Sequence, residues 1–280
     1  MSNLNFVQEL SLGKAYEGKV GKWWSSRSDN KDHVVAYNNI AKHIGFLDPD
    51  DDIIIDYGCG AGNLLLSMAR KFPNSKLIGI DSSTLMLQSA RRKLNRIGKD
   101  FTSKYKLLKS NLPNFDLKLE KANVLVLCFP HIVDVSYKKQ RNSHGHRRTD
   151  VDIAKFIASS MVGNKKDQTD ADDIRMLTNI LLEEKIISKN LRYLLKKGGT
   201  CVRIEYAKSK RERLTQLRQD RLAFQEGSLK KSVNGNIIKP VFKHVSSSYF
   251  KSNIVQDVFY QTKDASDKVG GYEITVLKAV

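Results

Sequence analysis

The sequence has few cysteines and no long hydrophobic run. Its three cysteines, Cys59, Cys128 and Cys201, form no CxxC pair of the kind that binds zinc, so we expect buried free thiols rather than a disulfide framework. Apolar runs are far shorter than the roughly 20 residues that a membrane-spanning helix needs. The N-terminus also lacks a basic region followed by a hydrophobic one. These absences predict a soluble, cytoplasmic protein with no membrane partner.

Acidic residues are scarce relative to basic ones. Lysine and arginine number 48 against 30 aspartates and glutamates, which gives a net charge of +18 concentrated in residues 101–150 and 201–250. A basic surface of this size attracts RNA, DNA or an acidic substrate. A lysine-rich, solvated surface explains the charge equally well. Hydrophobic residues make up 40% of the chain, enough for the core of one large α/β domain.

The most informative stretch is residues 53–65, which read IIIDYGCGAGNLL. A hydrophobic strand runs into Gly58, Gly60 and Gly62 and then into an apolar helical face. Glycines allow positive φ and close approach of a ligand, and the following helix presents unpaired N–H groups, so the pattern predicts a ligand cradle. The phosphate-loop motif GxxxxGK[ST] is absent. Asn63 stands where the dinucleotide-binding fingerprint has its third glycine.

A second acidic residue stands at the end of the next predicted strand. Residues 76–80 (KLIGI) form a short hydrophobic strand that ends at Asp81, 25 residues after Asp56. A carboxylate at the end of a second strand can accept hydrogen bonds from both hydroxyls of a ribose.

This combination resembles the first two motifs of the class I S-adenosylmethionine-dependent methyltransferases. A third matching feature is the turn Lys197-Gly198-Gly199 before the strand at residues 201–205. The resemblance covers roughly residues 32–130, 178–206 and 258–280. It implies an α/β fold with a doubly wound, seven-stranded, mostly parallel sheet and an antiparallel C-terminal strand, plus an N-terminal lid and a helical insertion. It also implies S-adenosylmethionine as cofactor and S-adenosylhomocysteine as product.

The resemblance further implies which residues hold the cofactor. Asp56 and the glycine turn frame its amino acid and sugar, Asp81 holds the ribose, and Asn111 takes the place of the acid that usually bonds the adenine amino group. No metal is expected. The expected cofactor-binding residues are Asp56, Gly58, Cys59, Gly60, Gly62, Asp81, Ser82, Asn111, Leu112, Cys128 and Phe129.

The acceptor side is marked by fewer residues. His131 follows Phe129-Pro130 after the buried strand at residues 123–128, and its ordinary pKa of about 6.5 suits a group that orients or deprotonates an acceptor. A polar loop residue is the alternative reading. Glu205 and Tyr206 end the next strand and are the other two catalytic candidates.

The leading functional hypothesis is methyl transfer to a small molecule. An RNA methyltransferase is the first alternative, because Phe129-Pro130 and the basic loop after them faintly resemble the tRNA guanine-N7 methyltransferases. The second alternative is another reaction of the same cofactor, aminocarboxypropyl transfer or cyclisation, which would release methylthioadenosine. A homo-oligomer is compatible with all three.

The expected organisation is an N-terminal lid or extension at residues 1–31 and a methyltransferase domain at residues 32–280. A helical insertion is expected at about 131–175 and a basic insertion at about 208–250. Helices are expected at 32–46, 63–71, 82–97 and 178–195, and a closing antiparallel hairpin from 258–261 and 272–280. The apolar face of the first helix is expected to contain Val34, Val35, Tyr37, Ile40, Ala41 and Ile44.

Overall fold

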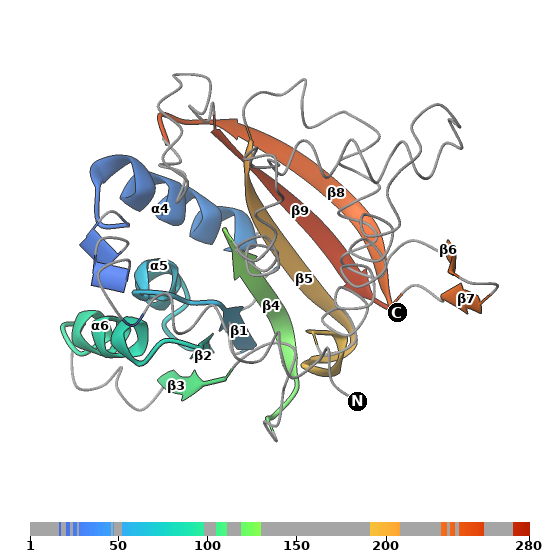
Figure 1. Cartoon of the computed structure of the whole chain (residues 1–280), viewed down its shortest axis with the longest axis horizontal. Helices are drawn as coiled ribbons and strands as arrows, with labels where there is room; N and C mark the ends of the chain where they lie inside the picture. Colours follow the sequence, from blue (N-terminus) through green and yellow to red (C-terminus); the bar gives the residue numbers. More distant parts are fainter. Residues whose placement is uncertain are drawn as a thin grey trace, which may run out of the picture.

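A seven-stranded sheet with the order β3-β2-β1-β4-β5-β9-β8 forms the centre of the computed structural model (Figure 1). The structure describes residues 17, 21–22, 25–26, 28–45, 47, 52–97, 105–110, 119–129, 191–207, 231–233, 236–238, 241–254 and 271–280. Three predicted site residues lie outside these ranges: Asn111, Leu112 and His131. So do the helical insertion and nearly all of the predicted helix at 178–195.

Five strands pair in parallel and the last strand is antiparallel to them. The chain order reverses between β1 and β4, and ligands of open α/β sheets bind at the carboxyl ends of strands at such a switch point. A separate pair, β6 and β7, consists of Lys231–Val233 and Asn236–Ile238. The strands of the main sheet are β1 Ile53–Tyr57, β2 Lys76–Asp81, β3 Tyr105–Lys109, β4 Ala122–Cys128, β5 Leu195–Ala207, β8 Phe242–Lys251 and β9 Gly271–Ala279.

The predicted doubly wound, seven-stranded, mostly parallel sheet is confirmed, but the prediction of the closing hairpin was wrong in one strand. β9 pairs on one side with β5 and on the other with β8, so its hairpin partner is residues 242–251 rather than 258–261. The segment 258–261 itself lies outside the described residues. β8 is an edge strand whose middle is exposed and rich in serine, and it therefore carries little of the apolar alternation that identifies a strand. The end of the predicted basic insertion is thus part of the sheet.

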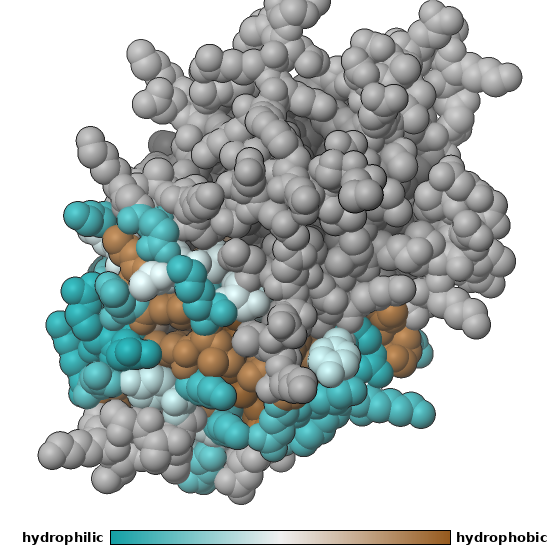
Figure 2. Space-filling model, turned by 60° about the horizontal axis from the view of Figure 1, so that its bottom comes forward, coloured by the Kyte–Doolittle hydropathy of each residue, from teal (hydrophilic) through white to brown (hydrophobic). Residues whose placement is uncertain are grey.

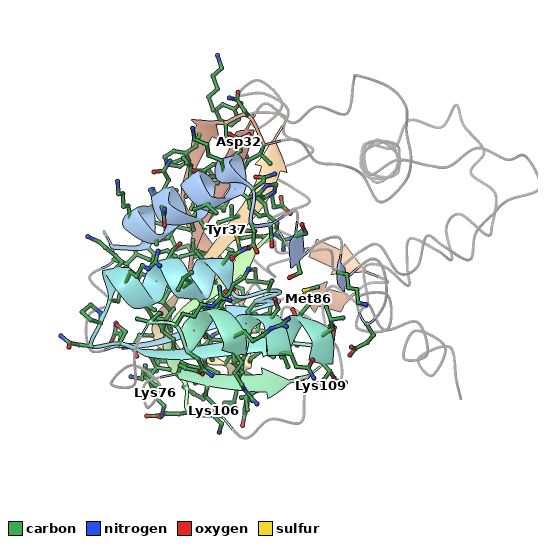
Figure 3. The ribbon with its side chains drawn as sticks, turned by 90° about the vertical axis from the view of Figure 1, so that its left-hand side faces the viewer. Asp32, Tyr37, Lys76, Met86, Lys106 and Lys109 are labelled. Carbon is green, nitrogen blue, oxygen red and sulfur yellow. The ribbon has the colours of Figure 1, made fainter. Side chains whose placement is uncertain are left out.

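Three helices lie side by side in Figure 3: α4 Lys31–Gly45, α5 Asn63–Lys71 and α6 Thr84–Leu94. Two of them begin at side-chain caps. The Asn30 Oδ1 accepts the backbone N–H of His33 at 2.9 Å, and the Ser83 hydroxyl accepts that of Met86 at 3.2 Å. α5 instead follows Gly62, which offers no side-chain cap, so its first N–H groups face the glycine turn.

The buried face of α4 differs from the predicted one at its start. Tyr37, Ile40, Ala41 and Ile44 are buried as expected, whereas Val34 and Val35 are 40% and 50% exposed. His33 and Ala36 are buried in their place, since positions 33, 36, 37, 40, 41 and 44 form the continuous stripe at helical spacing. The two valines fall outside this stripe.

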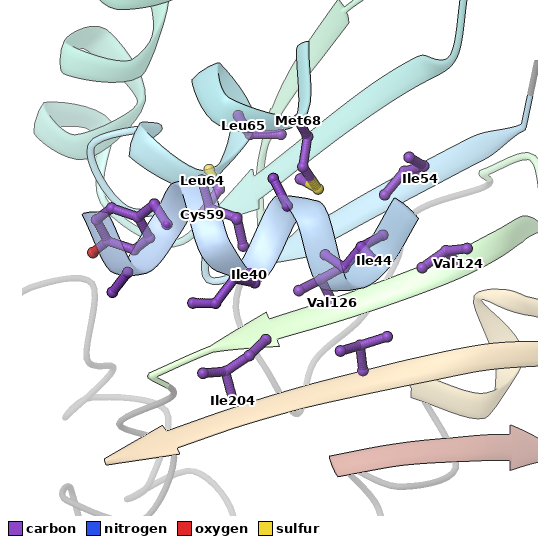
Figure 4. Packing of buried hydrophobic residues seen from close by; sticks show 14 of the residues in the cluster. Ile40, Ile44, Ile54, Cys59, Leu64, Leu65, Met68, Val124, Val126 and Ile204 are labelled. Atoms are coloured by element: carbon purple, nitrogen blue, oxygen red, sulfur yellow. The ribbon is translucent and has the colours of Figure 1, made fainter. Parts of the chain in front are cut away.

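The core has a layer on each face of the sheet. On one face, side chains from α4 and α5 pack on β1, β4 and β5 (Figure 4). Ile40 and Ile44 of α4 are fully buried there, and each such side chain stabilises the fold by about 1.5 to 3 kcal/mol. The other face buries a second cluster that includes Ile55, Leu125 and Leu195.

The surface of the described part is mixed. Figure 2 shows a band of hydrophobic residues bordered by hydrophilic ones on one side of the molecule. Lys106 and Lys109 lie on β3, the strand at one end of the sheet order, and Lys76 begins the neighbouring strand β2 (Figure 3). Among the described helices, none is long and apolar enough to cross a membrane.

Candidate cofactor site

The glycine turn after β1 is docked on the end of β2. The backbone N–H groups of Gly58 and Cys59 both donate to the Ile80 carbonyl, at 2.8 and 3.0 Å. Gly58, Gly60 and Gly62 have φ values of +78°, +52° and +80°, a region in which other L-residues are strained. The predicted strand, turn and helix are therefore present, and the turn conformation depends on its glycines.

The glycines of this region differ in what surrounds them. A Cβ at Gly58 or Gly60 would meet no atom of the described residues within 4 Å, so these positions are open toward that part of the chain. A Cβ at Gly62 would lie 2.7 Å from the Ala90 Cβ, and one at Gly79 would lie 2.5 Å from the Leu65 Cδ1. Gly62 and Gly79 thus permit helix packing, whereas Gly58 and Gly60 leave room for a ligand against the backbone.

Asp81 connects this turn to the start of α6. One carboxylate oxygen accepts the Gly60 N–H at 2.8 Å and the other accepts the Ser83 N–H at 2.9 Å. Burial raises the pKa of Asp81, although these backbone donors act in the opposite direction. The Ser82 N–H also acts on this carboxylate, and the lone pairs that remain can accept hydrogen bonds from a ligand.

Asp56 is the most unusual group of the site. It is 1% exposed, and neither carboxylate oxygen has a hydrogen-bond partner among the described residues. Burial, with a further contribution from the charge of Asp81, raises the pKa of Asp56 to about 8. A buried carboxyl without donors is costly, and a ligand that brings positive charge or N–H groups would satisfy it.

The ends of β4 and β5 border the same edge of the sheet. Phe129 follows β4 with a φ of +50°, its N–H donates to the Ile204 carbonyl at 2.9 Å, and its ring is buried. The rings of Tyr37 and Tyr272 meet it edge-on, with centroids 6.2 and 6.3 Å away. α4 is thereby packed against the strand ends beside the glycine turn.

Glu205 is engaged on the sheet itself. Arg203 is 4% exposed and donates from Nε and Nη2 to the Glu205 Oε1 at 3.1 and 2.8 Å. Glu273 lies opposite Glu205 in the antiparallel register and is also buried. The Glu205 carboxylate therefore balances a buried arginine. The Tyr206 backbone pairs with Tyr272 in the same ladder.

All three cysteines are free thiols, as predicted, and Cys59 and Cys201 are buried. Burial raises the pKa values of the Cys59 and Cys128 thiols well above the usual range, so both stay protonated at neutral pH. In the described ranges no three histidine, cysteine, aspartate or glutamate side chains gather as metal ligands.

Nine predicted cofactor residues fall within the described ranges, and the structure places them at the carboxyl edge of adjacent strands or in the turns that follow. These are Asp56, Gly58, Cys59, Gly60, Gly62, Asp81, Ser82, Cys128 and Phe129. Sequence reasoning missed Glu17, whose carboxylate accepts the N–H groups of Thr84 and Leu85 at 2.6 and 3.1 Å. It also missed the side chains that Asn63 contacts. No sequence pattern marks these long-range partners.

The sheet order and the glycine turn between two acid-ending strands define the class I methyltransferase fold. Residues 54–143 match a family described as "Methyltransferase domain". Trans-aconitate 2-methyltransferase from Methylobacterium radiotolerans is 47% identical over 45 residues, which are 16% of this chain and 17% of that protein. Carboxy-S-adenosyl-L-methionine synthase from Nautilia profundicola is 37% identical over 75 residues, 27% of this chain and 30% of that protein.

Solved structures with bound cofactor or product have a similar fold. Magnesium protoporphyrin IX methyltransferase from Synechocystis PCC 6803, solved with bound S-adenosylmethionine, has a TM-score of 0.52 at 12% identity, covering 96% of this chain and 95% of that one. The N-methyltransferase NodS from Bradyrhizobium japonicum, solved with S-adenosylhomocysteine, has a TM-score of 0.51 at 11% identity, covering 98% and 97%. Residues 54–143 of this chain therefore match a methyltransferase domain family, and the sheet has the fold of class I S-adenosylmethionine-dependent methyltransferases.

Proposed function

We propose that the protein uses S-adenosylmethionine to methylate a small-molecule acceptor. The observation that carries the proposal is the pair of acids around the open glycine turn. Asp56 is buried without a donor among the described residues, and Asp81 retains lone pairs at the end of the next strand. S-adenosylmethionine has an ammonium group, a sulfonium and a ribose diol. Its positive charge matches Asp56 and its diol matches Asp81.

The bound cofactor supplies a methyl group that its sulfonium already activates, so the protein's contribution is mainly positioning. Gly58 and Gly60 let the backbone approach the cofactor where a Cβ would stand in the way. Asp81 is held by backbone donors, among them Gly60 and Ser83, and so presents its remaining lone pairs in fixed directions. A cation beside Asp56 would lower its pKa and ionise it in the complex.

A small acceptor is supported by the names of the relatives, because the acceptor of a trans-aconitate 2-methyltransferase is a small molecule. His131 and Tyr206 are our candidates for residues that face the acceptor. Glu205 is a weaker candidate, because its carboxylate already serves Arg203.

Two alternatives can be tested: an RNA acceptor by the salt dependence of binding, and another reaction of the cofactor by the product released. The lysines along β3 favour an RNA acceptor, and binding to RNA would weaken steeply as salt rises, whereas binding of a small acceptor would change little. One similar protein is named as a synthase of carboxy-S-adenosyl-L-methionine, so a related cofactor site also occurs with another reaction type. Release of methylthioadenosine instead of S-adenosylhomocysteine would identify the aminocarboxypropyl or cyclisation chemistry.

Isothermal titration with S-adenosylhomocysteine tests the cofactor site directly. We expect the wild-type protein to bind, and Asp81→Ala to bind at least tenfold more weakly because two hydrogen bonds to the ribose are lost. Glu120→Ala is the control and should bind as wild type does. Glu120 is an exposed acid that forms an ion pair with Lys76, and it is far from the glycine turn in the sequence. Full affinity in a folded Asp81→Ala protein would refute the assignment of Asp81.

A further inference from the structure

A short segment ahead of α4 is tied to the glycine turn by a buried side-chain network. We call it the pre-helix segment; its described residues are 25, 26 and 28–30. The segment is folded on itself, because the Ser28 hydroxyl donates to the Ser25 carbonyl at 3.0 Å and the Asp29 N–H donates to the Ser26 carbonyl at 3.2 Å. Its last residue, Asn30, caps α4.

Asn63 is the centre of this network. Its side-chain amide donates to the Ser28 carbonyl at 2.8 Å and to the Ser28 hydroxyl at 2.9 Å, and both bonds are buried. Its amide oxygen accepts from the Lys93 ammonium at 2.6 Å. Both ends of one amide are thus used to join the pre-helix segment, α5 and α6.

Two further contacts hold the same segment. Lys93 also forms an ion pair with Asp29, and its side chain is only 14% exposed. The hydroxyls of Ser25 and Ser89 are hydrogen-bonded at 2.9 Å. Because Ser89 and Lys93 lie one helical turn apart on α6, the segment is fixed along that helix as well as to Asn63.

The position of Asn63 makes this network relevant to the ligand. Asn63 directly follows Gly62, the last glycine of the turn, and is the first residue of the uncapped helix α5. The segment it holds leads through Asn30 into α4, which carries Tyr37 to the Phe129 ring at the end of β4. One amide therefore couples the glycine turn to the element that packs on the next strand end.

We infer that Asn63 is a positioning residue for cofactor binding, an inference that depends on the proposed function. Its amide holds the pre-helix segment against the glycine turn in the free protein. The segment is therefore already ordered when the cofactor binds, and the entropy cost of ordering it does not reduce the free energy of binding. Without the amide donors, the pre-helix segment would lose its two hydrogen bonds to Asn63 in the free protein. The expected effect is about tenfold weaker binding of S-adenosylhomocysteine.

The substitution Asn63→Asp separates positioning from helix stability. Aspartate keeps an oxygen toward Lys93, replaces the donors to Ser28 by an acceptor, and is favourable in the first turn of a helix. Lower helix stability at this position would therefore not account for a loss of affinity in this variant. Asn63→Ala accompanies it, because it loses the same donors without adding charge. We expect both variants to bind S-adenosylhomocysteine about tenfold more weakly than wild type by titration calorimetry.

Ser67→Ala is the matched control. Ser67 lies on the same helix, is also buried, and its hydroxyl donates to the Asn38 Oδ1 at 2.8 Å, so its loss removes one α4–α5 bond without touching the pre-helix segment. Its affinity should equal that of wild type. Amide hydrogen exchange at residues 25, 26 and 28–30 supplies a second readout. These amides should exchange faster in the free Asn63 variants than in the free wild-type or Ser67→Ala protein.

Unchanged affinity in both Asn63 variants, or an equal loss in Ser67→Ala, would overturn the inference. If wild type binds and Asp81→Ala does not, that result refutes the role of Asn63 alone and leaves the proposed function standing. If wild type itself does not bind S-adenosylhomocysteine, the proposed function and the role of Asn63 fall together.

Discussion

Asp56 gives the stability of the free protein a pH dependence that one substitution should remove. Its pKa rises from the usual 3.8 to about 8 on folding. The folded state therefore holds a proton that the unfolded state lacks over the range between these values. By linkage, this group makes the protein less stable as pH rises from about 4 to about 8, and no further loss follows above the folded pKa.

The size of the effect follows from the shift. Each pKa unit corresponds to about 1.4 kcal/mol. The raised pKa of Asp56 therefore lowers the free energy of unfolding at pH 7 by up to about 4 kcal/mol, compared with a carboxyl whose pKa does not change on folding. Asp56→Asn has nearly the same shape and does not titrate. The charge of Asp81 contributes to the shift, so the two carboxyls titrate as a coupled pair. The substitution removes one of the two titrating groups of this pair.

The assay is denaturant unfolding of the cofactor-free protein at pH 5, 6, 7 and 8. We expect the free energy of unfolding of Asp56→Asn, minus that of wild type, to increase as pH rises, by up to about 1.4 kcal/mol per pH unit. Any constant cost of burying the asparagine amide shifts the curve without changing this slope. Glu120→Gln, a change at an exposed acid, should parallel wild type apart from its own small titration. A difference between Asp56→Asn and wild type that stays constant from pH 5 to 8 would refute the reasoning.

Two glycines and one distant acid give further predictions. Gly62→Ala should destabilise the fold by about 2 to 4 kcal/mol in denaturant unfolding, because of its positive φ and the contact with Ala90. Gly58→Ala should cost only about 1 to 2 kcal/mol and instead weaken S-adenosylhomocysteine binding at least tenfold, since its methyl group enters ligand space. Although partial burial acts to raise it, the pKa of Glu17 is lowered by the N–H groups of Thr84 and Leu85. The melting-temperature advantage of wild type over Glu17→Gln should therefore be present above pH of about 4.3 and disappear as pH falls below it.

The parts of the fold that the sequence predicts well are those with local periodicity. The strand, glycine turn and helix around Gly58 depend on neighbouring residues, and α5 spans Asn63–Lys71 as expected. β8 was missed because an exposed edge strand shows no apolar alternation. Val34 and Val35 were misplaced because two apolar residues at the start of a helix do not fix its rotation, whereas the buried His33 does.

The candidate site divides in the same way. Asp56 and Asp81 were recognised because a strand and an acid are adjacent in sequence. The contacts of Asn63 with Ser28 and of Glu17 with Thr84 join residues 35 and 67 positions apart, and only the folded chain brings them together. Nor does a sequence report that a carboxyl is buried without a donor. The unusual pKa of Asp56 therefore became visible only in the structure.

The place of β9 in the sheet has a consequence for how the protein is made. β9 lies between β5 and β8, although both precede it along the chain. β8 therefore has no place in the sheet until β9 has been synthesised and inserted, and the edge of β5 waits unpaired during that time. Unpaired strand edges promote association between chains, and contacts between residues far apart in sequence form slowly. Insertion of β9, Gly271–Ala279, should therefore mark the step at which the new chain loses its tendency to aggregate.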